Sequence, residues 1–262
     1  MTTRIIQFEK PKLKNPIFIE GLPGIGNVGR IAAGHLVEEL KAKKFAELYS
    51  SHFMPFILLE KGSEAHLLKN EFYYWKGKQK GQRDLIILIG DSQSADPEGF
   101  YEICEEVLRY LQKLGVKEIF TLGGLSVGEL VGKPKVFGVV NHPSLIEQYK
   151  NCGIDFEGGE RIGTIVGASG LFVGLAGYYG MKAVCLLGET VGYPIIPDPK
   201  SAEAVLNALS KAIKIKIDTS KLEKRIREME DFMRKIQEVQ RKAIERLVKP
   251  PKPKKEELTY IG

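Results

Sequence analysis

Six residues near the start of the chain, GIGNVG at positions 24–29, match the G-x-G-x-x-G pattern of dinucleotide-binding loops. They follow a short apolar run at 16–20 and precede a stretch with apolar residues at helical spacing, 30–44. Between a strand and a helix, such glycines let backbone N–H groups approach a pyrophosphate at the helix N-terminus. We therefore expect a ligand loop made of Gly21, Pro23, Gly24, Gly26, Asn27 and Gly29.

Departures from the nucleotide-binding pattern leave a second interpretation of this loop open. The second strand of a dinucleotide-binding unit ends in an acid that binds the ribose, whereas the predicted strand at 45–53 ends in Ser50, Ser51 and His52. No Lys-Ser or Lys-Thr pair follows the glycines, as a phosphate-binding P-loop requires. The alternative is a tight strand-to-helix corner, in which the glycines provide positive φ angles and close packing.

Polar residues follow several predicted strands, at the positions where α/β proteins bind ligands. Asp91 and Gln93 follow one apolar strand, Asn141 and His142 follow another, and Glu189 ends a third. We expect these side chains to line one cleft with the glycine loop, or alternatively to cap helices and hold loops. The spacing gives no Ser/His/Asp or Cys/His set and no metal-ligand cluster. We therefore assign no catalytic residue and expect neither a metal nor a cofactor.

Composition and charge limit the partners and the location. The 262 residues are 43% apolar, which is enough for one large domain with an appendage. The chain has no 18-residue apolar run, no export signal at its start and only three scattered cysteines, so we expect a cytoplasmic protein without a membrane partner. Residues 221–262 hold 13 Lys/Arg against 8 Asp/Glu, so the rest of the chain is almost neutral and nucleic acid is not an expected partner.

Strands that alternate with helices predict an α/β fold with a mostly parallel sheet covered on both faces. The apolar runs at 16–20, 84–94, 116–126 and 181–190 are typical of central strands, and 97–115 and 199–217 are typical of helices. A hairpin is expected to begin in 67–77. The α/β domain is predicted to span residues 1–217.

Residues 218–248 form a predicted second region. Apolar residues recur there at intervals of four and three over nearly four heptads, which is typical of a coiled-coil seam. One interpretation is an amphipathic helix that lies along its own domain, and the other is a helix for self-association or for docking on a partner. The residues proposed for a partner contact are Leu222, Ile226, Met229, Met233 and Ile236.

Residues 249–262, KPPKPKKEELTYIG, form a predicted flexible docking tail. A Pro- and Lys-rich segment stays extended and solvated, and this one ends in an apolar tip beside the terminal carboxylate. Such a tip fits a receiving pocket, so Leu258, Tyr260, Ile261 and Gly262 are candidate partner-binding residues. The alternative is a frayed, solubilising end.

The ordered motifs GLPGIGNVGRIAA, GDSQ, LGGL, GASGLFVGLA, LLGET and GYP-x-x-PDP together resemble the proteasome assembly chaperone family, and most closely its archaeal members. The resemblance covers roughly residues 15–215. It implies a three-layer α/β/α Rossmann-like fold akin to nucleoside phosphorylases, no established catalysis, oligomers, and a role at the proteasome α-ring. Some archaeal members are described as engaging that ring through a terminal hydrophobic–Tyr–any motif. Here Tyr260 is third from the end, one position earlier than in that motif.

Together these features predict a non-enzymatic, homo-oligomeric protein-binding factor. Its expected partners are further copies of itself, and proteasome α-subunits or a paralogue of the same family. The alternative is an enzyme that binds a small molecule or a nucleotide at the N-terminal glycine loop.

Overall fold

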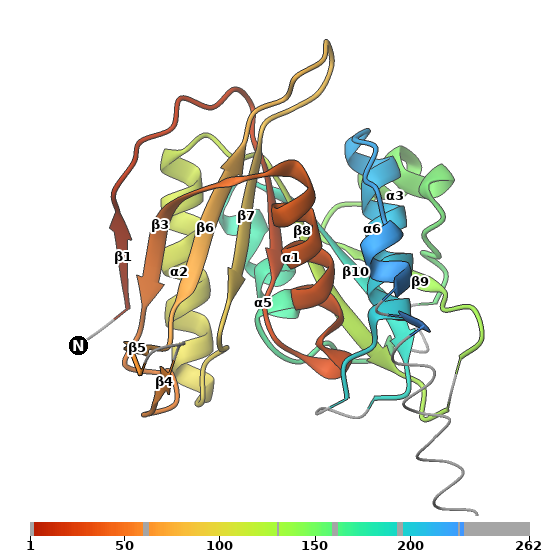
Figure 1. Cartoon of the computed structure of the whole chain (residues 1–262). Coiled ribbons are helices and arrows are strands. Elements are labelled where there is room, and N and C mark those ends of the chain that lie inside the picture. Colours follow the sequence, from red (N-terminus) through yellow and green to blue (C-terminus); the bar gives the residue numbers. More distant parts are fainter. Residues whose placement is uncertain are drawn as a thin grey trace, which may run out of the picture.

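An eight-stranded sheet forms the middle layer of the computed structural model, with the strand order β1-β3-β6-β7-β2-β8-β10-β9 (Figure 1). The structure describes residues 3–59, 63–129, 131–158, 162–192, 196–224 and 226–227. The strands of the sheet are β1 (Arg4–Gln7), β2 (Ile17–Gly21), β3 (Lys43–Tyr49), β6 (Asn70–Trp75), β7 (Leu85–Gly90), β8 (Glu118–Ser126), β9 (Val136–Val140) and β10 (Lys182–Thr190).

The sheet is parallel at its centre and antiparallel at both edges. β2 pairs in parallel with β7 and with β8, and β8 pairs in parallel with β10. On one side β1, β3 and β6 join β7 through antiparallel pairings, and on the other side β9 runs antiparallel to β10. The predicted hairpin is confirmed as β6 and β7. The expected mostly parallel sheet therefore holds for the four central strands and is wrong for the outer ones.

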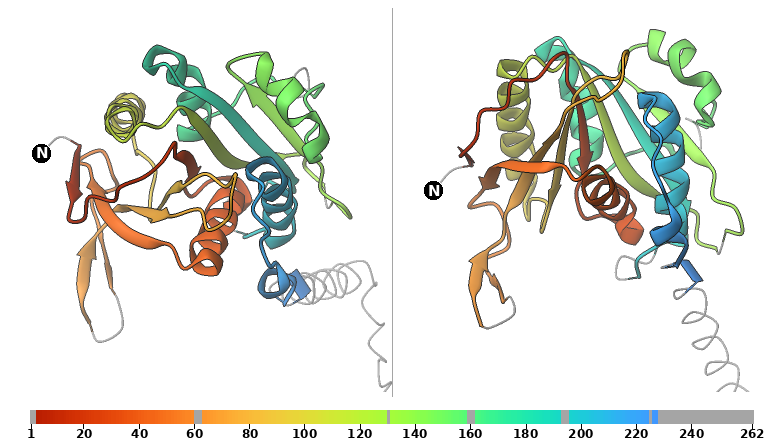
Figure 2. Two further views of the ribbon diagram at one scale, coloured as in Figure 1. Left: turned by 90° about the horizontal axis from the view of Figure 1, so that it is seen from above. Right: turned by 45° about the horizontal axis from the view of Figure 1, so that its top comes forward.

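Helices cover both faces of the parallel centre, as the α/β pattern predicts. α1 (Val28–Leu40) and α6 (Pro199–Ile213) pack on one face, and α2 (Pro97–Lys113) and α5 (Ala168–Ala176) pack on the other (Figure 2). Asp96 caps α2 and Asp198 caps α6, each followed by a proline at the first helical position. The smaller helical segments are η1 (Ile25–Asn27), α3 (Ser144–Tyr149), η2 (Lys150–Cys152) and η3 (Gly177–Tyr179).

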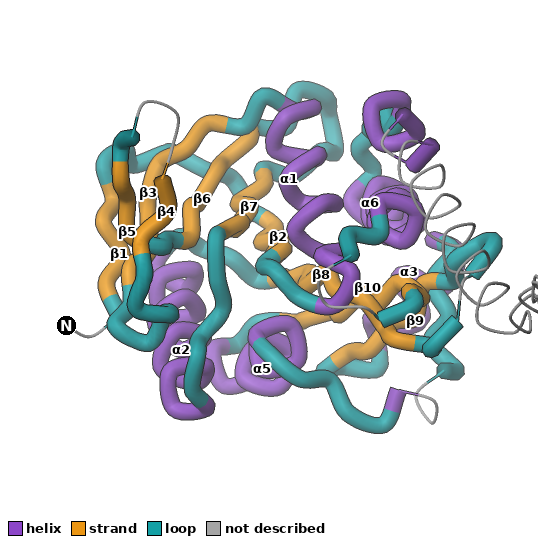
Figure 3. Tube along the Cα trace, turned by 60° about the horizontal axis from the view of Figure 1, so that its bottom comes forward, coloured by secondary structure: helices purple, strands orange, loops and turns teal. Residues whose placement is uncertain are grey.

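The antiparallel end of the sheet is built differently. In Figure 1, α2 lies behind β3 and β6, while no helix lies in front of them. From this end projects a separate two-stranded arm, formed by β4 (Ile57–Leu59) and β5 (Ala65–Leu67). Figure 3 shows the arm beside β3, at the end of the molecule far from β9, and Figure 2 shows it standing out on the side of the sheet where α1 lies.

Packing continues beyond the predicted boundary at residue 217. Ile215, Ile217 and Leu222 are buried in the same core cluster as α1 and α6, and the side-chain Nε2 of His35 lies 2.6 Å from the carbonyl oxygen of Asp218. Leu222 is thus part of the domain's own core, as the first interpretation of the 218–248 region expects, and it is not exposed to a partner. Ile226 is half-buried, and the other predicted contacts, Met229, Met233, Ile236, Leu258, Tyr260, Ile261 and Gly262, lie outside the described residues.

Candidate functional site: the strand-end cavity

The glycine loop joins β2 to α1, as predicted, but packing explains most of its glycines. A Cβ on Gly29 would meet the carbonyl oxygen of Leu122 in β8, and a Cβ on Gly21 would meet Ala33 in α1. Gly26 has φ +60°, where a side chain is strained. Only open space and Gln93 Nε2, at 3.6 Å, surround a Cβ on Gly24. The second interpretation of the loop, a tight corner, therefore accounts for three of its four glycines.

Gln93 holds the loop to the opposite helical layer. Its amide nitrogen donates to the carbonyl oxygen of Pro23, and its Oε1 accepts a hydrogen bond of 2.9 Å from the backbone N–H of Ala168, the first residue of α5. The backbone N–H of Asn27 is likewise occupied, because it donates to the carbonyl oxygen of Gly24 at 2.9 Å. The backbone N–H groups of Asn27 and Ala168 are therefore already occupied by the chain's own oxygens.

The other predicted cleft residues do not gather at this loop. Asp91 accepts a hydrogen bond of 3.1 Å from the N–H of Lys69 and so holds the start of β6. Asn141 and His142 lie at the other end of the strands from the glycine loop. The reason is that β9 runs antiparallel to β10, so its carboxyl end meets the amino end of β10. Glu189 accepts from the N–H of Lys135 at 2.9 Å. The expectation of one shared cleft is therefore wrong for Asn141 and His142, and the alternative that such side chains hold loops fits the hydrogen bonds of Asp91 and Glu189.

A cavity of about 250 Å³ opens beside the loop, at the carboxyl ends of β2, β8 and β10. Its position fits the general rule for ligand sites in α/β sheets. Among the described residues that line it, none is Lys, Arg or His. The lining combines apolar side chains with four polar ones, Gln93, Ser126, Thr164 and Ser169.

Sequence reasoning missed the chemically most unusual group beside this cavity, the carboxyl of Glu20 in β2. Glu20 is fully buried; its Oε1 accepts from the N–H of Leu22 and its Oε2 accepts from Ser169 Oγ, each at 2.9 Å. Burial raises the pKa of Glu20 to about 7, although these hydrogen bonds act to lower it. The carboxyl can therefore gain or lose a proton near neutral pH, and Ser169 lies in contact with both Glu20 and the cavity. The one feature of the sequence that could have indicated this buried carboxyl is an acidic residue at the end of an apolar strand.

The described part of the chain offers little for nucleophilic, metal or membrane chemistry. Burial raises the pKa of the Cys104 and Cys185 thiols, the latter to about 12, so both stay protonated at neutral pH. Within the described ranges no three His, Cys, Asp or Glu side chains are grouped so that they would hold a metal ion. Nor does any described helix combine the length and apolarity that a bilayer crossing requires.

Comparisons with known proteins define the class. The PAC2 family model matches residues 18–237, so the chain belongs to the PAC2 family. The predicted resemblance to proteasome assembly chaperones is confirmed by solved structures. The chain is similar to Pyrococcus furiosus PbaB, described as an archaeal proteasome activator, with a TM-score of 0.84 and 46% identity over 90% of this chain and 99% of that chain.

Two further proteins extend the comparison. Pyrococcus furiosus PbaA, described as an archaeal homolog of proteasome-assembly chaperone, matches with a TM-score of 0.74 and 28% identity over 94% of this chain and 96% of that one. The protein MJ1210 of Methanocaldococcus jannaschii is 38% identical over 260 residues, which are 99% of this chain and 97% of that protein. The similarity thus extends over nearly the whole chain.

Proposed function

We propose that this chain is a protein-binding factor that works as a homo-oligomer in contact with the proteasome and performs no catalysis of its own. The similarity to PbaB carries the proposal, because it reaches 46% identity over nearly all of that chain. The parallel order β7-β2-β8-β10 with helices on both faces supports the finer inference of a Rossmann-like domain akin to nucleoside phosphorylases. Three cysteines without disulfide partners among the described residues are consistent with a cytoplasmic location.

The contact with the proteasome is assigned to the tail, residues 249–262. Leu258, Tyr260 and Ile261 supply an apolar tip on a Lys- and Pro-rich spacer, and such a tip suits a pocket on a large receptor. A homo-oligomer carries several tails, so each tail can bind weakly while the assembly binds tightly through effective concentration. A paralogue of the same family is the alternative receptor.

Deletion of residues 258–262 tests this assignment. We expect the truncated chain to keep the oligomeric mass of the full chain and to lose binding to isolated proteasome α-rings in surface plasmon resonance. Tyr260→Ala should lose most of the binding, whereas Tyr260→Phe, which keeps the ring, is the matched control. Unchanged binding by the truncated chain would remove the tail from the mechanism.

The nucleotide-binding alternative receives less support from the site. Phosphate binding at a helix N-terminus needs free backbone N–H groups and is favoured by cations. Here Gln93 occupies the first N–H of α5, and the described lining of the cavity contains no Lys or Arg. The neighbouring carboxyl of Glu20 would add repulsion once it ionises.

A further inference from the structure

The arm formed by β4 and β5 has one face that is wholly apolar and exposed. Ile57 pairs with Leu67 and Leu59 pairs with Ala65, so these four side chains share a face, since neighbours directly across an antiparallel pair point the same way. Ile57, Leu59 and Leu67 are 52%, 72% and 56% exposed. Leu58, on the other face, packs against the domain's core. The arm is therefore held to the domain by one face and leaves the other uncovered.

The apolar surface continues to the base of the arm. Met54 and Phe56 are each about half exposed, and beside them lies a hollow of about 340 Å³, whose lining includes Tyr49, Phe53 and Leu68. A projecting apolar ribbon and an apolar hollow therefore adjoin on one chain. We call Met54, Phe56, Ile57, Leu59 and Leu67 the arm surface.

The size of the arm surface indicates an interface. A two-stranded ribbon is at best marginally stable in water on its own. Five large side chains that are half exposed or more present on the order of 100 Å² each, or roughly 500 Å² together. This area is more than half of the roughly 800 Å² per partner that a standard protein interface buries.

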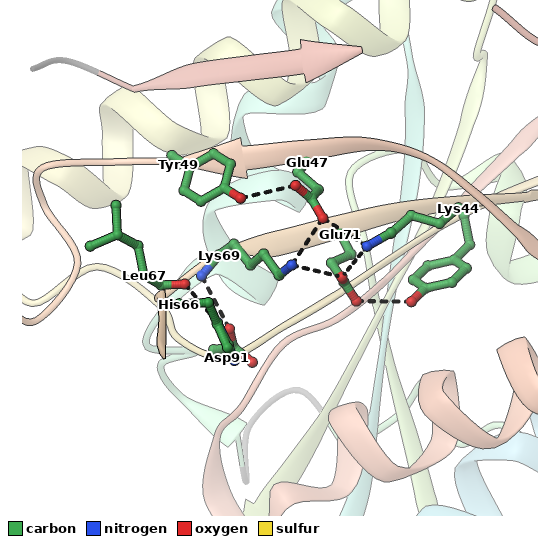
Figure 4. A network of polar contacts seen from close by, with 9 residues as sticks. Lys44, Glu47, Tyr49, His66, Leu67, Lys69, Glu71 and Asp91 are labelled. Atoms are coloured by element: carbon green, nitrogen blue, oxygen red, sulfur yellow. Dashed lines mark hydrogen bonds and ion pairs between the residues drawn. The ribbon is translucent and has the colours of Figure 1, made fainter. Parts of the chain in front are cut away.

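The sheet face next to the arm carries charges that cancel. Lys44 Nζ lies 2.7 Å from Glu47 and 2.9 Å from Glu71, and Lys69 Nζ lies 3.0 Å from Glu47 and 3.5 Å from Glu71 (Figure 4). Tyr49 OH donates to Glu47 at 2.9 Å. Burial opposes ionisation of Glu47, but the hydrogen bonds from the two lysines lower its pKa to about 2. Two cations and two anions therefore form a neutral cluster, which we call the ion-pair face.

Neutrality decides which partner fits. A two-fold interface brings a surface against its own copy, so a surface with charge of one sign would repel itself. The arm surface bears no charge and the ion-pair face bears no net charge, so neither repels a second copy. A nucleic acid, or a protein of strongly acidic or basic character, would need a charged surface instead.

We propose that the arm surface packs against the arm surface of a second copy of this chain about a two-fold axis, with the ion-pair face at the margin of the contact. The inference rests on the self-association proposed above and names the surface that produces it. The hollow beside Tyr49 would receive apolar side chains from the partner's arm.

Leu59→Asp tests the proposal, because Leu59 is the most exposed residue of the arm surface and its replacement leaves the core intact. We expect Leu59→Asp to weaken self-association by at least about 30-fold, as loss of a central interface contact does, and to lower the mass found by light scattering and native mass spectrometry. Tyr178→Asp is the matched control: Tyr178 is 87% exposed in η3, away from the arm, and the variant should keep the wild-type mass. Equal amounts of Leu59→Asp and Leu59→Lys chains should associate better than either variant alone, because opposite charges then meet across the contact.

Hydrogen exchange of the wild-type chain supplies a second readout that needs no substitution. Backbone amides of residues 57–59 and 65–67 should exchange more slowly in the oligomer than after dilution to the monomer. Wild-type mass in both Leu59→Asp and Leu67→Asp, or equal exchange in the two states, would overturn the arm as the contact. A wild-type chain that is monomeric would instead refute the proposed self-association itself, and the two failures are distinguishable because only the first leaves an oligomer.

Discussion

Replacement of the buried Glu20 by Gln is expected to stabilise the protein at neutral and alkaline pH. In the folded chain burial raises the pKa of Glu20 to about 7, from an ordinary value of 4.5. Gln keeps the size of the protonated carboxyl and can still accept from the N–H of Leu22, while its amide can donate to Ser169 Oγ in place of the present bond. The substitution thus removes the ionisation and keeps the packing.

The size and sign of the effect follow from linkage between proton binding and folding. Below about pH 4.5 the carboxyl is protonated in both states and costs nothing. Between pH 4.5 and 7 the unfolded chain releases the proton while the folded chain retains it, so wild-type stability falls as the pH rises, and it levels off above 7. One pKa unit corresponds to about 1.4 kcal/mol, so the whole loss is about 3 kcal/mol.

Guanidinium unfolding from about pH 4 to pH 9 measures this difference. Glu20→Gln and the wild type should have similar unfolding free energies at the acidic end and differ by about 3 kcal/mol at the alkaline end, with Gln the more stable. Glu38→Gln, the same chemical change at an exposed position of α1, is the control and should follow the wild-type curve. Parallel curves for wild type and Glu20→Gln would show that the carboxyl is solvated or paired in a way this structure does not contain.

Two further predictions test the packing and the electrostatics. Gly29→Ala should destabilise the fold by about 1–3 kcal/mol in chemical denaturation, because its Cβ would meet the Leu122 carbonyl, whereas Gly24→Ala has room and should change stability by less than about 0.5 kcal/mol. Hydrogen bonds from His52 to Asp96 and Glu102 raise the pKa of His52 in the folded chain. The stability that these bonds give to the folded state is therefore complete below about pH 6.5, and it is lost as the pH rises through the pKa of His52 in the folded chain. The wild-type melting temperature should therefore fall more steeply than that of His52→Asn between about pH 6 and pH 8, and equal slopes would contradict the assignment.

Local patterns were sufficient to predict the central layer of the fold. Short stretches of sequence with clear boundaries were enough to predict the apolar strands β2, β7, β8 and β10 and the capped helices α2 and α6. The direction of the outer strands is not local information. The placement of Asn141 failed for this reason, because a strand that follows β8 in the chain can join β10 in either direction, and only tertiary packing selects the antiparallel one.

The residues of the cavity were harder to predict because they meet across long sequence separations. Glu20 and Ser169 are 149 positions apart, and neither has a local pattern that indicates the other. The same is true of Gln93. It was predicted only as a residue at the end of a strand, but in the structure it accepts a hydrogen bond from Ala168, 75 positions away. The arm was missed for a different reason: its two strands are three residues long, too short for alternation to distinguish them from a loop.

The strand-end cavity and the arm differ in whether their groups already have partners within the chain, and this difference supports the arm, rather than the cavity, as a surface for contact with a second copy. Around the cavity, Gln93 bonds to both Pro23 and Ala168, and Ser169 bonds to Glu20, so a ligand that binds Gln93 or Ser169 would have to compete with hydrogen bonds that the chain already makes. Contact with Leu59 and its neighbours on the arm requires no hydrogen bond to break, because covering their exposed apolar area only releases water. This contrast supports the proposal that the chain associates through the arm rather than closing over a small molecule at the glycine loop.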